Sequence, residues 1–216
     1  LCEISPFAAK HGVILDYAET NAAWWKGKES EAVLAECASC GIDCLLVSIS
    51  PFHNEFISFS KTKSLIAACA KSGLKVFPWI SDFVSDLSCF DENSPHKATE
   101  YTEKFGENYF IDALARYSVR FNGRAAEAFA PLLAKREADE IVRIHNSPCV
   151  ELFNTSHFHV DLYGNYLPGL CAGLSIDFNE LGEKLSEKKY PLLNLLSSYG
   201  IKGLYELAKK EFYYEP

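Results

Sequence analysis

The sequence has no methionine, no long apolar run and few basic residues. Without about 18 consecutive apolar residues, a membrane-spanning helix is not expected. A net charge of −8 argues against a nucleic-acid-binding surface, which needs clustered lysine and arginine. Because the chain opens at Leu1 in what reads as mid-domain sequence, we expect a fragment of a longer protein. Methionines that were modified and omitted from the printed sequence are the alternative explanation.

The composition is that of a globular protein. Its 216 residues are 48% hydrophobic and 23% charged, which is enough to build a sizeable core. We do not expect the eight cysteines to form a disulfide scaffold, because such scaffolds belong to short secreted domains and residues 1–20 do not show the pattern of a secretory leader. We therefore expect a cytoplasmic protein without nucleic-acid or membrane partners, whose substrate and oligomeric state stay open.

Three strands joined by helices are expected in the first 80 residues. Helical patterns end at Gly41 and Gly73, and a short apolar run follows each glycine. A similar Gly-to-strand pattern occurs at 11–17. Near-continuous apolar strands are typical of parallel sheets that are buried on both faces. The predicted fold class is α/β, a partial (β/α) barrel with parallel strands plus a C-terminal β-hairpin and helical extension. The expected helices span 29–40 and 61–72, and the later strands lie within 41–50 and 74–80.

The rest of the chain is expected to be mostly helical around one hairpin. Residues 86–95 are polar and predict a loop that could serve as a lid, and 95–145 predict helices with one strand at 118–121. The alternating segment 156–163 turns at Gly164-Asn165, which indicates a β-hairpin. We expect a barrel domain over 1–145 and a C-terminal extension over 146–216. The helices expected after the hairpin span 178–187, 191–198 and 203–210.

Polar residues follow each predicted parallel strand. They lie at 19–21, 48–53 and 79–82, and function gathers at the carboxyl ends of such strands. Strand-end capping and turn chemistry explain the same residues equally well. His53 could act on a substrate or cap the following loop, and the second role is favoured. Asp82 and Asp86 are candidate substrate contacts, and Trp24-Trp25 are expected to pack a helix.

Two further groups of residues could bind a metal. In His157-x-His159-x-Asp161, strand alternation puts three ligand-type side chains on one face, which suits zinc or iron. Hydrogen bonding within the fold is the alternative role for these histidines. Cys37, Cys40 and Cys44 form a compact group, but helix phase and a strand start favour separate packing roles.

The motifs Glu19-Thr-Asn21, Ser48-Ile-Ser-Pro-Phe-His53 and the hairpin from His157 to Cys171 together resemble radical SAM proteins. In that superfamily a partial barrel holds a [4Fe–4S] cluster and S-adenosylmethionine, and cleavage of that cofactor starts radical chemistry on a substrate. The resemblance makes the strand before Asn21 the third barrel strand and the strand with Ser48 the fourth. It implies that Thr20, Asn21 and Ser48 lie beside S-adenosylmethionine.

The hairpin is similar to auxiliary-cluster regions of the SPASM or twitch type, which implies Cys149 and Cys171 as cluster ligands. The 14 residues between Cys149 and Gly164 fit that pattern, whereas the six between Gly164 and Cys171 do not. The cluster motif C-x3-C-x2-C is absent, so the chain is expected to be an inactive fragment of a radical SAM enzyme. Alternatives are a non-catalytic barrel-derived binding module and a metal-dependent hydrolase using His157, His159 and Asp161.

Overall fold

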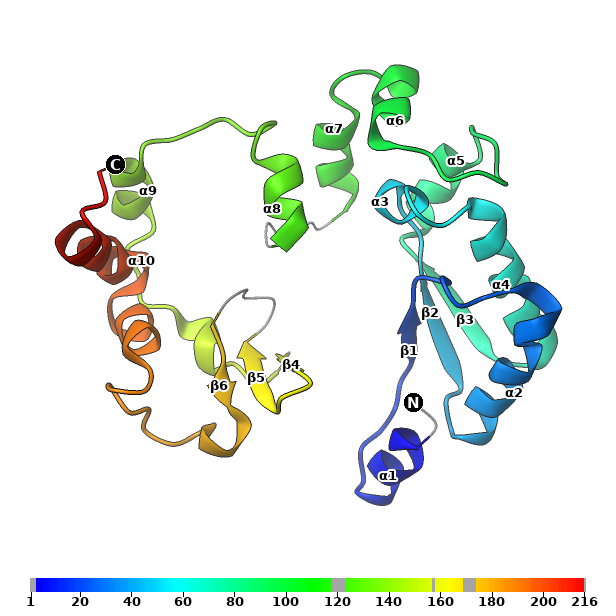
Figure 1. The fold of residues 1–216 in the computed structure, drawn as a ribbon, viewed down its shortest axis with the longest axis horizontal. Helices are drawn as coiled ribbons and strands as arrows, with labels where there is room; N and C mark the ends of the chain where they lie inside the picture. The colour runs from blue at the N-terminus through cyan, green and yellow to red at the C-terminus, as the bar shows by residue number, and fades with distance from the viewer. Residues whose placement is uncertain (1–2, 118–122, 157, 169–173, 216) are drawn as a thin grey trace. The chain divides into compact units, whose positions relative to one another are not determined.

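The computed structural model describes residues 3–117, 123–156, 158–168 and 174–215. It contains two compact units, Leu1–Ser118 and Val119–Pro216 (Figure 1). The sequence placed the division at 145/146. Helix α9 (Ala138–Ile144) instead groups with the second unit, because it packs on α10 (Pro191–Phe212) and the Tyr205 hydroxyl donates to Asp139 Oδ1 at 2.6 Å.

The first unit is built on a parallel sheet. Strands β1 (Ala18–Thr20), β2 (Cys44–Ser48) and β3 (Lys75–Trp79) pair in that order, all parallel. The predicted α/β class with parallel strands is therefore correct. The first strand was expected to follow the glycine of the 11–17 segment and to end at 19–21; β1 agrees with that end but begins only at Ala18. Ala18 is the first paired residue and lies opposite Leu45. The pairing cannot start much earlier, because β2 itself begins at Cys44.

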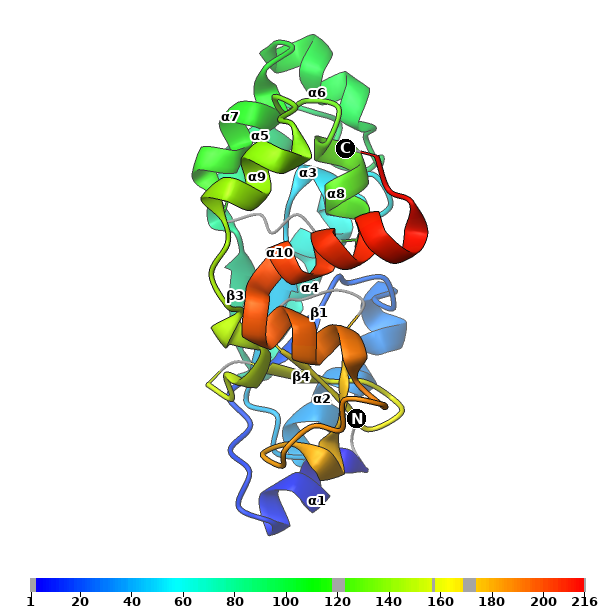
Figure 2. The ribbon, with the colours of Figure 1, turned by 90° about the vertical axis from the view of Figure 1, so that its left-hand side faces the viewer.

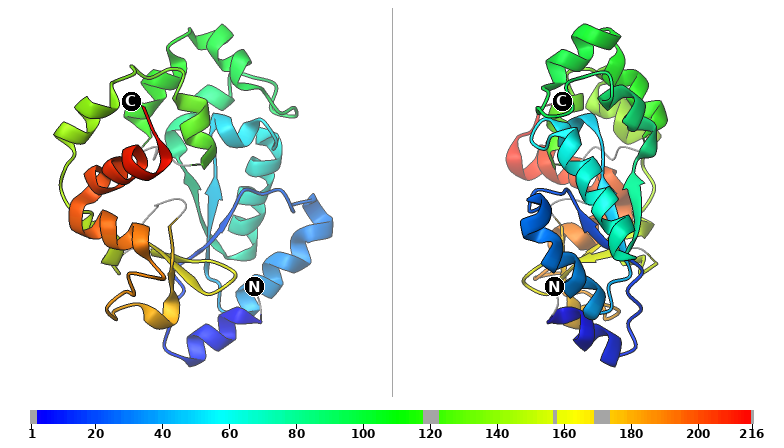
Figure 3. Two further views of the ribbon diagram at one scale, coloured as in Figure 1. Left: turned by 60° about the vertical axis from the view of Figure 1, so that its left-hand side comes forward. Right: turned by 90° about the vertical axis from the view of Figure 1, so that its right-hand side faces the viewer.

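Helices α2 (Glu31–Ser39) and α4 (Phe59–Ser72) cover one face of this sheet (Figures 1 and 3). Strand alternation points Leu45 and Val47 toward them. As predicted, α4 ends at Gly73, which adopts φ 77° and closes the helix. The buried residues of this layer are Ala22, Trp25, Leu34, Cys37, Ile42, Leu45, Val47, Leu65, Cys69 and Leu74.

Short helices complete the first unit. Asp86 accepts hydrogen bonds from the Tyr109 hydroxyl at 2.7 Å and from Arg116 at 2.6 Å. These bonds connect helix α5 (Val84–Leu87) to helix α7 (Tyr109–Arg116). Asp86 is thus occupied by structural partners. The elements are α1 (Ile4–Lys10), η1 (Gly27–Ser30), α3 (Pro51–Asn54), η2 (Ser81–Phe83), α5 (Val84–Leu87), α6 (Ala98–Phe105) and α7 (Tyr109–Arg116).

The second unit combines helices with an antiparallel sheet of order β4-β5-β6. Its core contains Tyr166 and Ile176 from the sheet and Leu193 from α10. Figure 2 shows α10 along its length, with the bend at Gly200 where φ is 60°. The other elements are α8 (Gly123–Phe129), η3 (Val150–Phe153), β4 (Phe158–Val160), β5 (Asn165–Pro168), β6 (Ile176–Asp177) and η4 (Phe178–Glu180).

Several expectations for this unit are corrected. The helix expected over 178–187 is only a short 3-10 turn, because Leu181 is extended and Gly182 has φ 91°. The two helices expected over 191–198 and 203–210 are confirmed, because α10 consists of two helical segments joined by a kink at Gly200, whose φ and ψ are not helical. The hairpin is confirmed, but its turn runs through 161–164. The strand expected at 118–121 lies outside the described residues.

Candidate functional site

The face of the parallel sheet that lies opposite α2 and α4 carries polar side chains at its carboxyl edge. Glu19 is in register with Leu46, and Ser48 is in register with Trp79. Because Leu46 and Ser48 alternate with the helix-facing Leu45 and Val47, this second face presents Glu19, Ser48 and Trp79 together. Strand register thus brings together three side chains that are far apart in the sequence.

Glu19 and Ser48 are directly bonded across the two strands. The Ser48 hydroxyl donates to Glu19 Oε1 at 3.1 Å. Ser48 is only 4% exposed, whereas Glu19 is exposed. The serine therefore orients a carboxylate that keeps hydrogen-bond acceptor capacity for a bound molecule.

His53 lies just after β2 and is oriented by Ser50. Ser50 caps α3, and its hydroxyl oxygen accepts the His53 backbone N–H at 3.3 Å. Ser50 is 1% exposed, so its own O–H needs a buried acceptor. In the described ranges that acceptor is His53 Nδ1 at 2.7 Å. Acceptance at Nδ1 leaves the proton of the neutral imidazole on Nε2, so His53 presents an N–H donor.

The Glu19 charge acts on two other titratable groups at this edge. Burial lowers the pKa of His53, and Glu19 opposes that shift only in part. Burial raises the pKa of Tyr117, the Trp79 indole partly opposes this shift, and Glu19 adds to it. At neutral pH the imidazole and the phenol are therefore both uncharged. The site combines one carboxylate with neutral hydrogen-bonding groups and an indole.

The residues carried over from the resemblance do not all lie on this face. Ser48 does. Thr20 is in register with Val47, so its side chain lies on the helix-covered face, where Oγ1 accepts from the Trp24 indole at 2.8 Å. Asn21 is exposed after β1, and its Oδ1 accepts the Ala23 backbone N–H at 3.0 Å.

The cysteines do not gather at this edge. Cys37 is buried on α2, Cys40 follows that helix and Cys44 begins β2, at the opposite end of the strand from Ser48. Burial and the neighbouring Cys37 thiol raise the pKa of Cys69, which suits a packing role. Among the described residues, no three histidine, cysteine or acidic side chains come close enough to hold a metal ion.

Of the hairpin residues proposed as metal ligands, Asp161 is engaged in holding the turn and two lie outside the described residues. Asp161 Oδ1 accepts the backbone N–H groups of Tyr163 and Asn165, both at 2.9 Å, and Oδ2 accepts from the Asn165 amide at 2.9 Å. These bonds hold the turn and lower the pKa of Asp161. His159 lies on β4 and Cys149 precedes η3, whereas His157 and Cys171 are not described.

Sequence reasoning missed two members of the site. Glu19 was noted as part of a strand end but given no role, although its register with Leu46 follows once β1 is paired. Tyr117 comes from beyond α7, and no local pattern links it to β3. The Ser-Pro-x-His order at 50–53 is a helix-start signal, so the Ser50 cap could have been found from sequence.

The arrangement suits binding of a molecule that offers hydroxyl groups to a carboxylate and an apolar surface to an indole. Trp79 is 47% exposed beside Ser48 and is available for such contact.

No helix in the described part of the chain has the length and apolarity needed to cross a bilayer. Comparison with family models, curated proteins and solved structures found no match to this chain.

Proposed function

We propose that the chain forms the later part of a radical SAM-type partial barrel and that the Glu19–Ser48 edge binds the adenosyl portion of S-adenosylmethionine. The motifs at 19–21, 48–53 and 157–171 are the basis of the resemblance. The parallel order β1-β2-β3 agrees with consecutive strands of such a barrel. In an enzyme of that superfamily, the cofactor supplies a 5′-deoxyadenosyl radical that abstracts hydrogen from a substrate.

The observation that carries the proposal is the hydrogen-bonded pair of Glu19 and Ser48. A carboxylate accepts two hydrogen bonds from neighbouring hydroxyl groups, which is the pattern that a ribose diol offers. Ser48 fixes Glu19 Oε1 from the buried side and leaves the carboxylate exposed on the other. Trp79, in register with Ser48, supplies a ring surface on which a nucleobase can stack.

The other carried-over residues fit this ligand to different degrees. Asn21 is exposed next to Glu19, and its amide NH2 can donate to a ligand while Oδ1 holds the turn. Thr20 acts indirectly, because its hydroxyl oxygen fixes Trp24 and the turn after β1. Thr20 is therefore a positioning residue in this proposal.

Cys37, Cys40 and Cys44 do not fit an iron–sulfur cluster at this edge. The cluster needs several thiolates around one point, whereas Cys37, Cys40 and Cys44 lie around α2 and the start of β2. No reaction step is therefore derived through a cluster for these residues. In this proposal the cluster belongs to sequence outside 1–216, and a C-x3-C-x2-C motif in the full reading frame is required.

Binding measured by calorimetry tests the proposal on the 216-residue chain. We expect S-adenosylmethionine and 5′-deoxyadenosine to bind, and 2′,5′-dideoxyadenosine to bind more weakly because it lacks one ribose hydroxyl. The Glu19→Gln variant should lose about 10- to 100-fold in affinity for 5′-deoxyadenosine, since hydrogen bonds to a charged group contribute about 1.5–3 kcal/mol. It should also lose the preference for the diol.

Glu36→Gln is the matched control. Glu36 is exposed on α2, on the other side of the sheet, and its replacement removes the same charge as Glu19→Gln. It should bind like the parent chain. Failure of the parent chain to bind any adenosyl compound, or equal losses in the two variants, would refute the proposal.

A non-catalytic barrel-derived binding module is the second candidate, because it requires no group of thiolates and the described Cys37, Cys40 and Cys44 form none at this edge. It shares the Glu19–Ser48 edge but needs no cluster. Reconstitution of the full-length protein with iron and sulfide separates the two candidates. Cluster absorbance with reductive cleavage of S-adenosylmethionine supports the enzyme, whereas binding without cleavage supports the module.

A further inference from the structure

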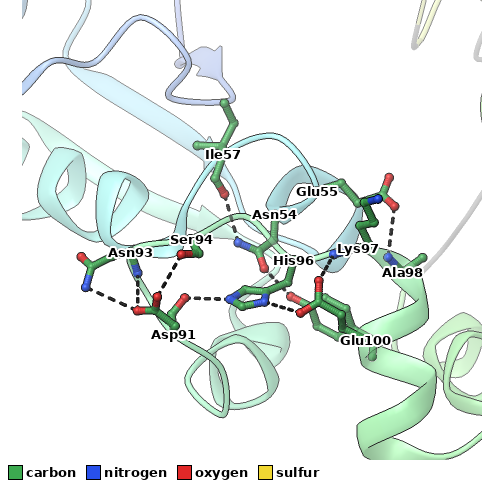
Figure 4. Close-up of polar contacts among 11 residues, drawn as sticks. Asn54, Glu55, Ile57, Asp91, Asn93, Ser94, His96, Lys97, Ala98 and Glu100 are labelled. Atoms are coloured by element: carbon green, nitrogen blue, oxygen red, sulfur yellow. Dashed lines mark hydrogen bonds and ion pairs between the residues drawn. The ribbon is translucent and has the colours of Figure 1, made fainter.

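His96 is a buried histidine whose two ring nitrogens both face acceptors. It is 9% exposed. Nδ1 lies 2.8 Å from Glu100 Oε2, and Nε2 lies 2.8 Å from the Asp91 backbone oxygen (Figure 4). A carboxylate and a carbonyl can only accept, and neutral imidazole has a single N–H. Both contacts are hydrogen bonds only when His96 is an imidazolium.

His96 joins the 88–97 segment to α6, and these two elements together hold α3 through three further hydrogen bonds, one from His96 and two from α6 (Figure 4). The His96 backbone N–H donates to the Asn54 carbonyl at 3.0 Å. The Tyr101 hydroxyl donates to Asn54 Oδ1 at 2.6 Å, and the Ala98 N–H donates to Glu55 Oε1 at 3.1 Å. Asn54 is the last residue of α3 and is 2% exposed. The position of α3 therefore depends on the segment that His96 fastens.

We propose that His96 is a protonation-dependent latch that fastens the 88–97 segment to α6 and thereby holds α3, with His53, at the carboxyl edge of the parallel sheet. When the imidazolium loses its proton, one of its two hydrogen bonds is lost. The 88–97 segment is then less firmly attached to α6, and α3 is held less firmly in turn. The latch concerns the placement of His53 and does not depend on which ligand the edge binds. The lid role suggested for the polar loop at 86–95 stays a prediction.

The charges around His96 favour its protonated form. Burial opposes the charge, but the hydrogen bonds to Glu100 and to the Asp91 carbonyl raise the pKa of His96 above its ordinary value. The same bond, together with the Lys97 N–H, lowers the pKa of Glu100. The Phe90 ring packs at 4.9 Å from the imidazole and Lys104 lies over that ring. The other charged groups of the adjoining segments are Asp91, Glu92, Lys97, Glu55 and Lys63.

The sign of the pH dependence follows from these two shifts. Because the pKa of His96 is raised on folding, its stabilisation is complete below about pH 6.5 and is lost as pH rises through the folded-state pKa. Because the pKa of Glu100 is lowered, its contribution is present above about pH 4.5 and is lost as pH falls through the folded-state value. The latch is therefore strongest in the mildly acidic window between these values.

Two NMR measurements on the 216-residue chain test the latch. In a titration of the histidine ring protons, assigned with His96→Gln, we expect a pKa for His96 above the ordinary histidine value of about 6.5. In amide hydrogen exchange corrected for the intrinsic pH effect, protection of His96, Asn54 and Glu55 should fall at least 10-fold between pH 6 and pH 8. Protection of Val47 in the sheet should change much less.

Glu100→Gln separates the latch from general unfolding, because it keeps His96 and removes only the charge that holds its proton. In this variant we expect a lower pKa for His96 and α3 protection at pH 6 that already resembles the parent chain at pH 8. His145→Gln is the control and should behave like the parent chain. A His96 pKa at or below about 6.5, or α3 protection that is unchanged between pH 6 and pH 8, would overturn the proposal.

Discussion

Replacing Gly200 by alanine should destabilise the second unit by about 3–5 kcal/mol, since it combines backbone strain with a steric overlap. Gly200 adopts φ 60° and ψ −155° within α10, a conformation that is essentially confined to glycine. An added Cβ would also overlap the Ser147 carbonyl oxygen, which is backbone and cannot rotate away. To accommodate the methyl group, the kink of α10 at Gly200 and the backbone of residues 147–148 would have to move apart.

The measurement for Gly200→Ala is amide hydrogen exchange in β5 and α10. Tryptophan fluorescence is unsuitable here, because Trp24, Trp25 and Trp79 all belong to the first unit. Gly182→Ala is the matched control, since Gly182 has φ 91° but nothing lies within 4 Å of an added Cβ. It should cost only about 1–2 kcal/mol. Similar losses in the two variants would show that the close approach at Ser147 contributes nothing.

Asn54→Leu should destabilise the first unit by about 2–5 kcal/mol, because two buried partners lose their hydrogen bonds at once. Asn54 Oδ1 accepts from the Tyr101 hydroxyl, and Nδ2 donates to the Ile57 carbonyl at 3.0 Å. Tyr101 is fully buried, so its hydroxyl cannot turn to water instead. Leucine has a similar volume to asparagine, which limits the change to lost polar contacts.

Urea unfolding followed by tryptophan fluorescence measures this loss, because all three indoles report on the first unit. Tyr101→Phe should give a smaller loss of about 1–2 kcal/mol, since it leaves the Ile57 bond intact. Asn108→Leu makes the same substitution at an exposed residue without a side-chain cap bond, and should stay within about 0.5 kcal/mol. A midpoint for Asn54→Leu that equals that of Asn108→Leu would contradict the expected role.

The sequence predicted the parallel part of the fold well where glycine and helix phase mark the boundaries. Gly41 and Gly73 located the ends of α2 and α4, and the apolar runs after them became β2 and β3. It failed at 178–187, where apolar residues at helical spacing lie in an irregular segment. There the positive φ of Gly182 prevents a continuous helix. The apolar side chains Leu181 and Leu185 pack instead in the hydrophobic core that contains Tyr166.

The candidate site was predictable only in part, because half of it depends on strand pairing. Ser48 was found, since polar residues that follow a buried strand can be read directly. Glu19 joins it only through the register between β1 and β2, and Tyr117 only through the packing beyond α7. His96 was not singled out, although both acceptors are close in the sequence: Glu100 follows it by four residues and Asp91 precedes it by five.

The two sheets also differ in how soon their strands can meet during folding. In the second unit, Phe158 pairs with Pro168 across one tight turn that Asp161 closes with its own side chain. Hairpins of this kind form within about 1–10 μs. In the first unit, Ala18 pairs with Leu45 only after the chain has passed through the whole of α2. This greater sequence separation costs more loop-closure entropy, so the ladder that aligns Glu19 with Ser48 should form later than the hairpin.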